Sequence, residues 1–199
     1  AVMMVYNNTP AAVLALKKSG IKTPADLNGK KLGAPGFDAG RRAFPIFAKA
    51  NKISGVTWVS MDPALRETML ARGEMDAAFM TQVLPSQAAT TATKAGARLI
   101  DIEGPVVEDL RTRYPYLKRT LIPQVTYPNQ DKPVRTIGVD LLLVCRADVD
   151  DGVAYRLLDA YFATRPDTGP PTDFERAPAT PIPLHAGAAR YYRQRELSR

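Results

Sequence analysis

The alternation of expected strands and helices between residues 31 and 102 most restricts how this chain can fold. Short apolar strands are expected at 31–34, 56–60, 75–80 and 97–102, with helical patterns between them. Strand–helix–strand units of this length join parallel strands through right-handed crossovers. The sequence therefore predicts an α/β fold with a mostly parallel sheet and flanking helices.

The segments on either side complete this outline. Residues 1–22 are expected to form two extended runs, 2–6 and 12–16, separated by the Asn and Pro residues at 7–10. The later expected elements are a helix at 106–113, an extended crossing segment at 121–133, a buried strand at 136–145, and helices at 150–164 and 184–197.

In parallel sheets ligands bind beyond the carboxyl ends of the strands. This rule places the turn at 35–42 and the residues after the strands at 56–60 and 75–80 on one edge. The turn is glycine-rich and opens onto a helix, so its backbone N–H groups are suited to hold an anion. Arginine next to them adds a forked donor for a carboxylate, sulfonate or phosphate. The candidate ligand-binding residues are Gly36, Phe37, Asp38, Ala39, Gly40, Arg41 and Arg42 from the turn, with Thr81, Gln82 and Tyr127 from other segments.

The residues alone leave an alternative open at this turn, namely an ordinary strand-to-helix connection whose arginines face water. Pro45 limits where the helix begins, because proline deeper than the first turn clashes with the carbonyl four residues earlier. We therefore expect the helix to start near 40–42. For Tyr127 the alternative to a ligand contact is an aromatic side chain packed against its own domain.

The sequence offers few candidate catalytic residues. The sequence has no glycine-rich nucleotide fingerprint, phosphate-binding loop, nucleophile elbow or zinc-protease motif. A catalytic role for the only histidine, His185, would need a partner that the sequence does not identify, so a structural role is favoured. The single cysteine, Cys145, rules out an intrachain disulfide and is expected to pack as a small apolar residue. We predict a binding protein with no cofactor, no metal and no enzymatic activity.

The chain carries 27 Lys and Arg against 20 Asp and Glu, a net charge of +7. The basic residues are scattered, which favours a solvated surface over a nucleic-acid site. No apolar run approaches the roughly 18 residues that a membrane span needs.

Two parts of the sequence resemble known families of receptors. TPADLNGKKLGAPGFDAGRRAFPIFAKANKI (23–53) and PALRETMLARGEMDAAF (63–79) are similar to the second lobe of periplasmic solute-binding proteins, in the group of the sulfonate, nitrate and taurine receptors and the thiamine-precursor-related (NMT1/THI5-like) proteins. RYPYLKRTLIPQVTYPNQDKPVRTIGVDLLLVCRADV (113–149), AYRLLDAYF (154–162) and PIPLHAGAARYYRQREL (181–197) resemble the TAXI receptors of TRAP transporters.

This resemblance implies a two-lobed type II periplasmic-binding-protein-like fold that closes on a small organic acid or amino acid. Residues 1–22 would supply first-lobe strands and the crossing, 23–124 the second lobe, and 125–199 the hinge return, the rest of the first lobe and a C-terminal wrap. The first lobe is expected to be incomplete. The resemblance also implies a periplasmic location, membrane permease subunits as partners and no nucleic acid, although no signal peptide is visible.

One departure concerns the ligand. The family turn usually carries hydroxyl side chains, whereas Phe37, Asp38 and Ala39 have none, and Asp38 would repel an anion unless arginine offsets it. Two other functions are compatible with the same scaffold: an enzyme of the kind used in thiamine-pyrimidine synthesis, and a ligand-sensing module of a regulator.

Overall fold

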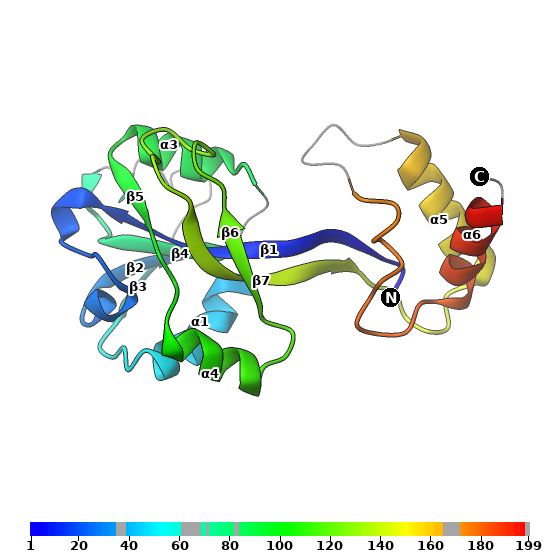
Figure 1. Ribbon diagram of the computed structural model, residues 1–199, viewed down its shortest axis with the longest axis horizontal. Coiled ribbons are helices and arrows are strands. Elements are labelled where there is room, and N and C mark those ends of the chain that lie inside the picture. Colours follow the sequence, from blue (N-terminus) through cyan, green and yellow to red (C-terminus); the bar gives the residue numbers. More distant parts are fainter. Residues whose placement is uncertain (35–38, 61–68, 71, 82–83, 165–171, 198–199) are drawn as a thin grey trace. The chain divides into compact units, whose positions relative to one another are not determined.

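The computed structural model describes residues 1–34, 39–60, 69–70, 72–81, 84–164 and 172–197 (Figure 1). The chain divides into two compact units, a large unit of residues 9–139 and a small unit of residues 1–8 and 140–199. The sequence-based lobe boundaries fall at 22/23 and 124/125 instead, and the assignment of lobes stays a prediction.

Seven strands and five helices make up the described elements. The strands are β1 (Met3–Leu16), β2 (Lys31–Ala34), β3 (Thr57–Ser60), β4 (Ala77–Thr81), β5 (Ala97–Ile100), β6 (Lys118–Ile122) and β7 (Val134–Leu143). The helices are α1 (Ala39–Ala50), α3 (Gln87–Lys94), α4 (Pro105–Arg113), α5 (Asp151–Thr164) and α6 (Ala186–Leu197), and short 3-10 turns occupy Lys17–Ser19 and Pro24–Leu27.

The predicted α/β fold is confirmed, with a sheet that is mixed. Its strand order is β3-β2-β4-β1-β7-β6, and β5 also pairs with β1. β2 pairs in parallel with both β3 and β4, so the carboxyl ends of these three strands share one edge, as expected. β1 runs antiparallel to β4 and β5, and β6 runs antiparallel to β7. The expectation of a mostly parallel sheet missed this reversal because the chain turns after β1 through 3-10 turns, without a crossover helix.

The first strand differs from the prediction of two separate runs. β1 is continuous over 14 residues and passes through the Asn and Pro residues that were expected to break it. Asn8 takes a positive φ of 62°, and its N–H donates a hydrogen bond to Oδ1 of Asp140 at 3.1 Å. The polar residues therefore produce a local bend that a second strand anchors, and pairing continues beyond it.

Other expectations are close to the structure. α1 begins at Ala39, one residue before the expected start, and keeps Pro45 inside it. β6 was not predicted, because its first three residues, Lys118, Arg119 and Thr120, are polar. The expected helix that begins at Pro63 lies largely outside the described residues.

The large unit has three layers. Alternate residues of β1 face opposite sides: Ala11, Val13 and Ala15 join one apolar cluster, and Ala12, Leu14 and Leu16 join the other. The first cluster includes residues of α1 and α4, and the second includes residues of α3, so we call these sides the α1/α4 face and the α3 face. Figure 1 shows α3 on one side of the sheet and α1 and α4 on the other.

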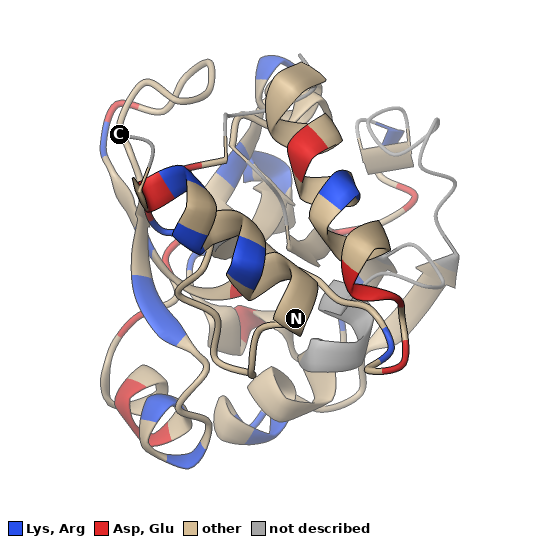
Figure 2. Cartoon of the chain, turned by 90° about the vertical axis from the view of Figure 1, so that its right-hand side faces the viewer, with Lys and Arg blue, Asp and Glu red and all other residues tan. Residues whose placement is uncertain are grey.

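The small unit has its own core between α5 and α6. Tyr191 of α6 is fully buried and packs against the rings of Tyr155, Phe162 and Phe174. Basic and acidic residues are interspersed along both helices (Figure 2). This distribution agrees with a solvated charged surface. Among the described helices, none is both long and apolar enough to cross a membrane.

Candidate functional site

Most of the predicted glycine-rich turn is not described. Gly36, Phe37, Asp38 and Gln82 lie outside the described residues, and the remaining turn residues, Ala39, Gly40, Arg41 and Arg42, form the first turn of α1. The first N–H groups of a helix have no acceptor within it. α1 follows β2, whose carboxyl end lies beside that of β3, so these donors belong to the predicted edge. Their role as an anion seat stays a prediction.

Thr81 is the predicted site residue whose surroundings are best defined. It is the last residue of β4 and lies opposite Ala11 in the antiparallel register with β1. Its side chain is half-buried and lines a pocket within the large unit. The structure thus places Thr81 at a cavity on the sheet edge, although a ligand contact remains a prediction.

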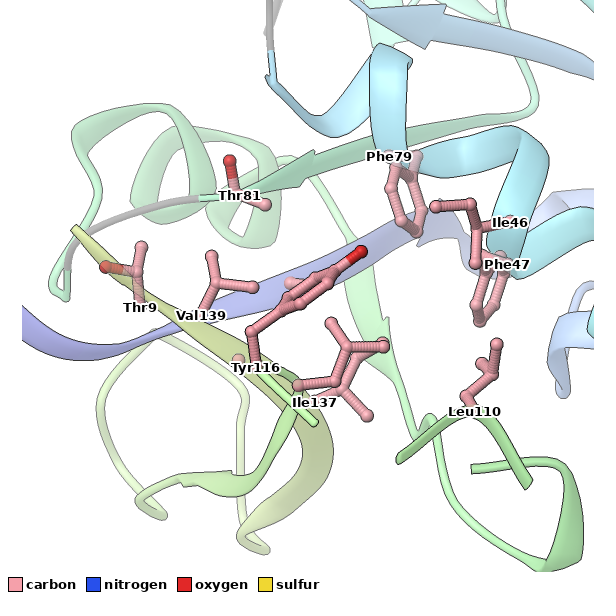
Figure 3. Close-up of a pocket in the computed structure, with 12 residues that line it drawn as sticks. Thr9, Ile46, Phe47, Phe79, Thr81, Leu110, Tyr116, Ile137 and Val139 are labelled. Atoms are coloured by element: carbon pink, nitrogen blue, oxygen red, sulfur yellow. The ribbon is translucent and has the colours of Figure 1, made fainter. Parts of the chain in front are cut away.

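The pocket is formed by five elements of the large unit and the segment after α4. Its cavity volume is about 70 Å³, and it is partly open. The lining is almost entirely apolar and consists of Thr9, Ala11, Ile46, Phe47, Phe79, Thr81, Leu110, Tyr116, Leu117, Ile137, Gly138 and Val139. Figure 3 shows Thr9 and Thr81 toward one end, Ile46, Phe47 and Leu110 toward the other, and the ring of Tyr116 between them.

Aromatic packing shapes the apolar end. Phe79 of β4 is 1% exposed, and its ring centroid lies 5.2 Å from those of Phe44 and Phe47 on α1. Trp58 of β3 extends this cluster, with its ring edge-on to Phe44 at 5.0 Å. Rigid rings in such contacts fix the wall of the pocket. Tyr116, which is 55% exposed, is the aromatic residue at the solvent side.

Thr9 gives the other end an unusual polar group. The residue is 6% exposed, and its Oγ1 has no hydrogen-bond partner within the described part of the chain. A buried hydroxyl without a partner is unfavourable and uncommon, and it calls for a reason. By contrast, the hydroxyl of Thr136, 3% exposed on β7, donates to the carbonyl of Ala11 at 2.7 Å.

Sequence reasoning missed most of this pocket. Thr9 lies in the segment read as a break between strands, and Tyr116 in a segment read as a helix end. Phe47 was expected to be on the apolar face of its helix, but the space beside it has no sequence signature. No lining residue is charged, so the pocket by itself offers shape and apolar contact.

Tyr127 lies on the other side of the sheet. It is 2% exposed and belongs to the apolar cluster of the α3 face. Its phenolic oxygen accepts a hydrogen bond from the N–H of Ser86 at 3.0 Å, and the Ser86 side chain caps α3. These contacts describe an aromatic packed against its own domain, and a ligand contact for Tyr127 stays a prediction.

The charged groups near α4 form an exposed cluster away from the pocket lining. Arg119 of β6 lies 2.7 Å from the carboxylate of Glu108, and Arg111 lies 2.9 Å from the same group. The hydrogen bond from Arg119 holds the pKa of Glu108 below its usual range. The pair with Arg119 links α4 to β6, and the pair with Arg111 lies within α4.

The described residues include no cluster of His, Cys, Asp and Glu suited to a metal ion. His185 precedes α6, where its Nδ1 accepts a hydrogen bond from the N–H of Gly187 at 3.2 Å and lies 3.6 Å from Oδ1 of Asp151. The imidazole is buried and ties the start of α6 to α5. This geometry agrees with the structural role that the sequence favoured.

Comparison with known proteins identifies the family. The profile of the NMT1-like family matches residues 1–195, nearly the whole chain, so the chain belongs to this family. Among curated proteins, no sequence matches.

Solved structures of periplasmic binding proteins share a distant likeness with the chain. An ancestral arginine-binding protein bound to arginine is 15% identical, with a TM-score of 0.45 over 82% of this chain and 57% of its own. The alkanesulfonate-binding protein SsuA of Xanthomonas axonopodis pv. citri, bound to MOPS, is 15% identical, with a TM-score of 0.45 over 82% of this chain and 68% of its own. An arginine-specific periplasmic binding protein of Salmonella typhimurium is 15% identical, with a TM-score of 0.44 over 96% and 62%. The chain therefore spans about 60% of the length of these proteins.

Proposed function

We propose that this chain is the solute-binding part of a membrane transport system and captures a small organic acid or amino acid outside the cytoplasm. The observation that carries this proposal is the apolar pocket on the α1/α4 face of the sheet, which extends to Thr81 at the carboxyl end of β4. A cavity at the carboxyl ends of strands is where α/β proteins bind small molecules. Membership of the NMT1-like family supports the same conclusion.

The acidic character of the solute is part of this proposal. α1 begins at Ala39, and its first N–H groups, which have no acceptor within the helix, would bind an anion. Arg41 and Arg42 belong to the same turn of helix and would add positive charge. In this proposal Gly36, Phe37, Asp38, Ala39 and Gly40 complete the seat from the backbone side, and Gln82 lies beside Thr81.

The type of transporter is a finer proposal. The segments 113–149 and 181–197 carry the resemblance to TAXI receptors, so we propose a TRAP permease as the partner. An ABC permease is the competing partner within the broader family of solute receptors. Co-purification of the chain with the membrane subunits encoded beside its gene would separate the two. Recovery of an ATP-binding subunit would contradict the TRAP assignment.

In this proposal residues 23–124 form the second lobe. Residues 1–22 and the returning segment 125–199 supply the hinge and the first lobe. The two lobes would close around the solute. Tyr127 would lie in the hinge segment. Periplasmic localisation is part of the same proposal.

The test is a thermal-shift screen of the purified chain against small carboxylates, amino acids and sulfonates, followed by calorimetric titration of any compound that raises the melting temperature. Binding of one class with 1:1 stoichiometry would support the proposal. A chain that none of these compounds stabilises would contradict it.

A substitution of His185 separates a receptor from an enzyme that uses this histidine in catalysis. We expect His185→Gln to leave solute affinity unchanged, because the described polar contacts of the imidazole are with Gly187 at the start of α6 and with Asp151. Turnover of a bound solute by the wild-type chain, lost in His185→Gln, would instead show an enzyme.

A further inference from the structure

The pocket in the large unit is an unfilled apolar space with a defined size. Its cavity volume is about 70 Å³. One water molecule needs about 10–15 Å³ of such space and two to four polar partners, so the cavity has room for about five small heavy atoms but little to hold water. Apolar cavities of this kind favour apolar guests.

The walls of the apolar end are fixed. Phe47 is 2% exposed and belongs to the apolar cluster of the α1/α4 face, and Leu110 of α4 is also 2% exposed. Side chains this well packed do not collapse readily into a neighbouring space. The pocket is therefore a permanent feature of the large unit, with Tyr116 at its solvent side.

The threonine end adds little polarity to the cavity. The Oγ1 of Thr9 is buried and has no partner in the described part of the chain, and Figure 3 shows the oxygens of Thr9 and Thr81 directed away from the other labelled side chains. The pocket therefore has apolar walls at both ends, which suit the alkyl part of a molecule. Because a charge buried without a partner is unfavourable, a charged group would stay at the open side of the pocket.

We propose that this pocket selects the alkyl chain of the solute: a short chain of two to four carbons lies against Phe47, Leu110 and Ile137, and the acidic group lies at the open side of the pocket. The inference deepens the proposed function and rests on it for the acidic group. The alkyl preference rests on the cavity alone.

The experiment is a titration series of the full chain with acetate, propanoate, butanoate, pentanoate and hexanoate, with propane-1-sulfonate as the sulfonate arm. Each buried methylene is expected to raise affinity by about fourfold until the cavity is full, after which affinity levels off. Equal affinity along the series would overturn the proposal while leaving acid binding, and therefore the proposed function, intact.

Ile46→Trp is the matched variant, because Ile46 is half-buried at the apolar end and the larger side chain fills the space. We expect it to remove the dependence on chain length. Val139→Phe fills the pocket from β7 and replaces Ile46→Trp where that variant does not fold. A filled variant that keeps the full chain-length dependence would contradict the proposal.

Butan-1-ol is the probe that separates failure of the pocket from failure of acid binding. Its binding is followed through the methyl NMR signals of Leu110 and Ile137. If no acid binds but butan-1-ol shifts these signals in the wild-type chain and not in Ile46→Trp, the apolar site stands and the acid proposal fails. If butan-1-ol shifts neither signal, the apolar site is refuted.

Discussion

The two faces of the sheet in the large unit differ in how they treat their buried polar groups. On the α3 face, the oxygen of Tyr127 accepts from the N–H of Ser86, and the hydroxyl of Thr93 donates to the carbonyl of Ala89 at 2.8 Å. On the α1/α4 face, the hydroxyl of Thr9 has no described partner and lies beside a cavity. Paired groups stabilise a face, whereas a buried hydroxyl without a partner and a cavity beside its residue leave the α1/α4 face less completely packed.

The largest expected effect is a loss of stability when the aromatic wall of the pocket is truncated. Phe79→Ala should lower the free energy of unfolding by about 3–5 kcal/mol, because it removes a buried ring that contacts Phe44 and Phe47 and leaves a larger cavity. Urea unfolding can be followed through Trp58, the only tryptophan, which packs against Phe44.

Phe79→Leu is the control, with a smaller loss because the residual cavity is smaller. A loss below about 1 kcal/mol for Phe79→Ala would show that the wall collapses easily. The α1/α4 face would then hold no permanent pocket.

The next effect concerns the α3 face. Tyr127→Phe should cost about 1–3 kcal/mol, because the N–H of Ser86 loses its buried acceptor. Solute affinity should not change. Ser86→Ala is the companion variant and should cost about 0.5–2 kcal/mol through loss of the α3 cap. If Tyr127→Phe instead weakens solute binding at unchanged stability, Tyr127 is a ligand residue as the sequence resemblance implied.

Thr9 and Thr136, two of the buried threonines of the large unit, provide a matched pair. Thr9→Val removes an unpaired hydroxyl and should change stability by less than about 0.5 kcal/mol or raise it, since no hydrogen bond is lost. Thr136→Val removes the donor to the carbonyl of Ala11 and should cost about 1 kcal/mol. Equal losses in the two variants would mean that Thr9 is not unpaired in solution.

The smallest effect is electrostatic and lies on the outer side of α4. The hydrogen bond from Arg119 lowers the pKa of Glu108 in the folded chain, so the stabilisation is present above the unfolded-state pKa of about 4.3 and is lost as pH falls through the lower folded value. Wild type should therefore lose more stability than Glu108→Gln between pH 5 and pH 3, by a small amount because both groups are exposed.

High salt should reduce this difference between the two chains. Parallel pH profiles for wild type and Glu108→Gln would show that the pair contributes nothing to the α1/α4 face.

The spacing of apolar residues and the positions of turn residues in the sequence predicted most of the fold. β2 was predicted with its observed bounds, and α1 within one residue, because turn residues and apolar spacing mark them. β6 was missed since its first three residues are polar, and the continuity of β1 was missed since a long-range contact between Asn8 and Asp140 supports the bend. Local patterns do not contain such partners.

The candidate site was predictable only in its location. The expected strand order placed the carboxyl end of β4 at the predicted ligand-binding edge, and Thr81 was a candidate residue for that reason. The cavity depends on how Phe47, Leu110 and Tyr116 pack, and these residues come from elements far apart in the sequence. A space between side chains has no signature in any one segment.

The central claim, that the pocket holds the alkyl part of a small acid, is tested most directly by a crystal structure of the chain soaked with 3-bromopropanoate. The account predicts an anomalous bromine peak among Phe47, Leu110 and Ile137, with the carboxylate at the open side of the pocket. A bromine peak outside the pocket, with the cavity left empty, would contradict it.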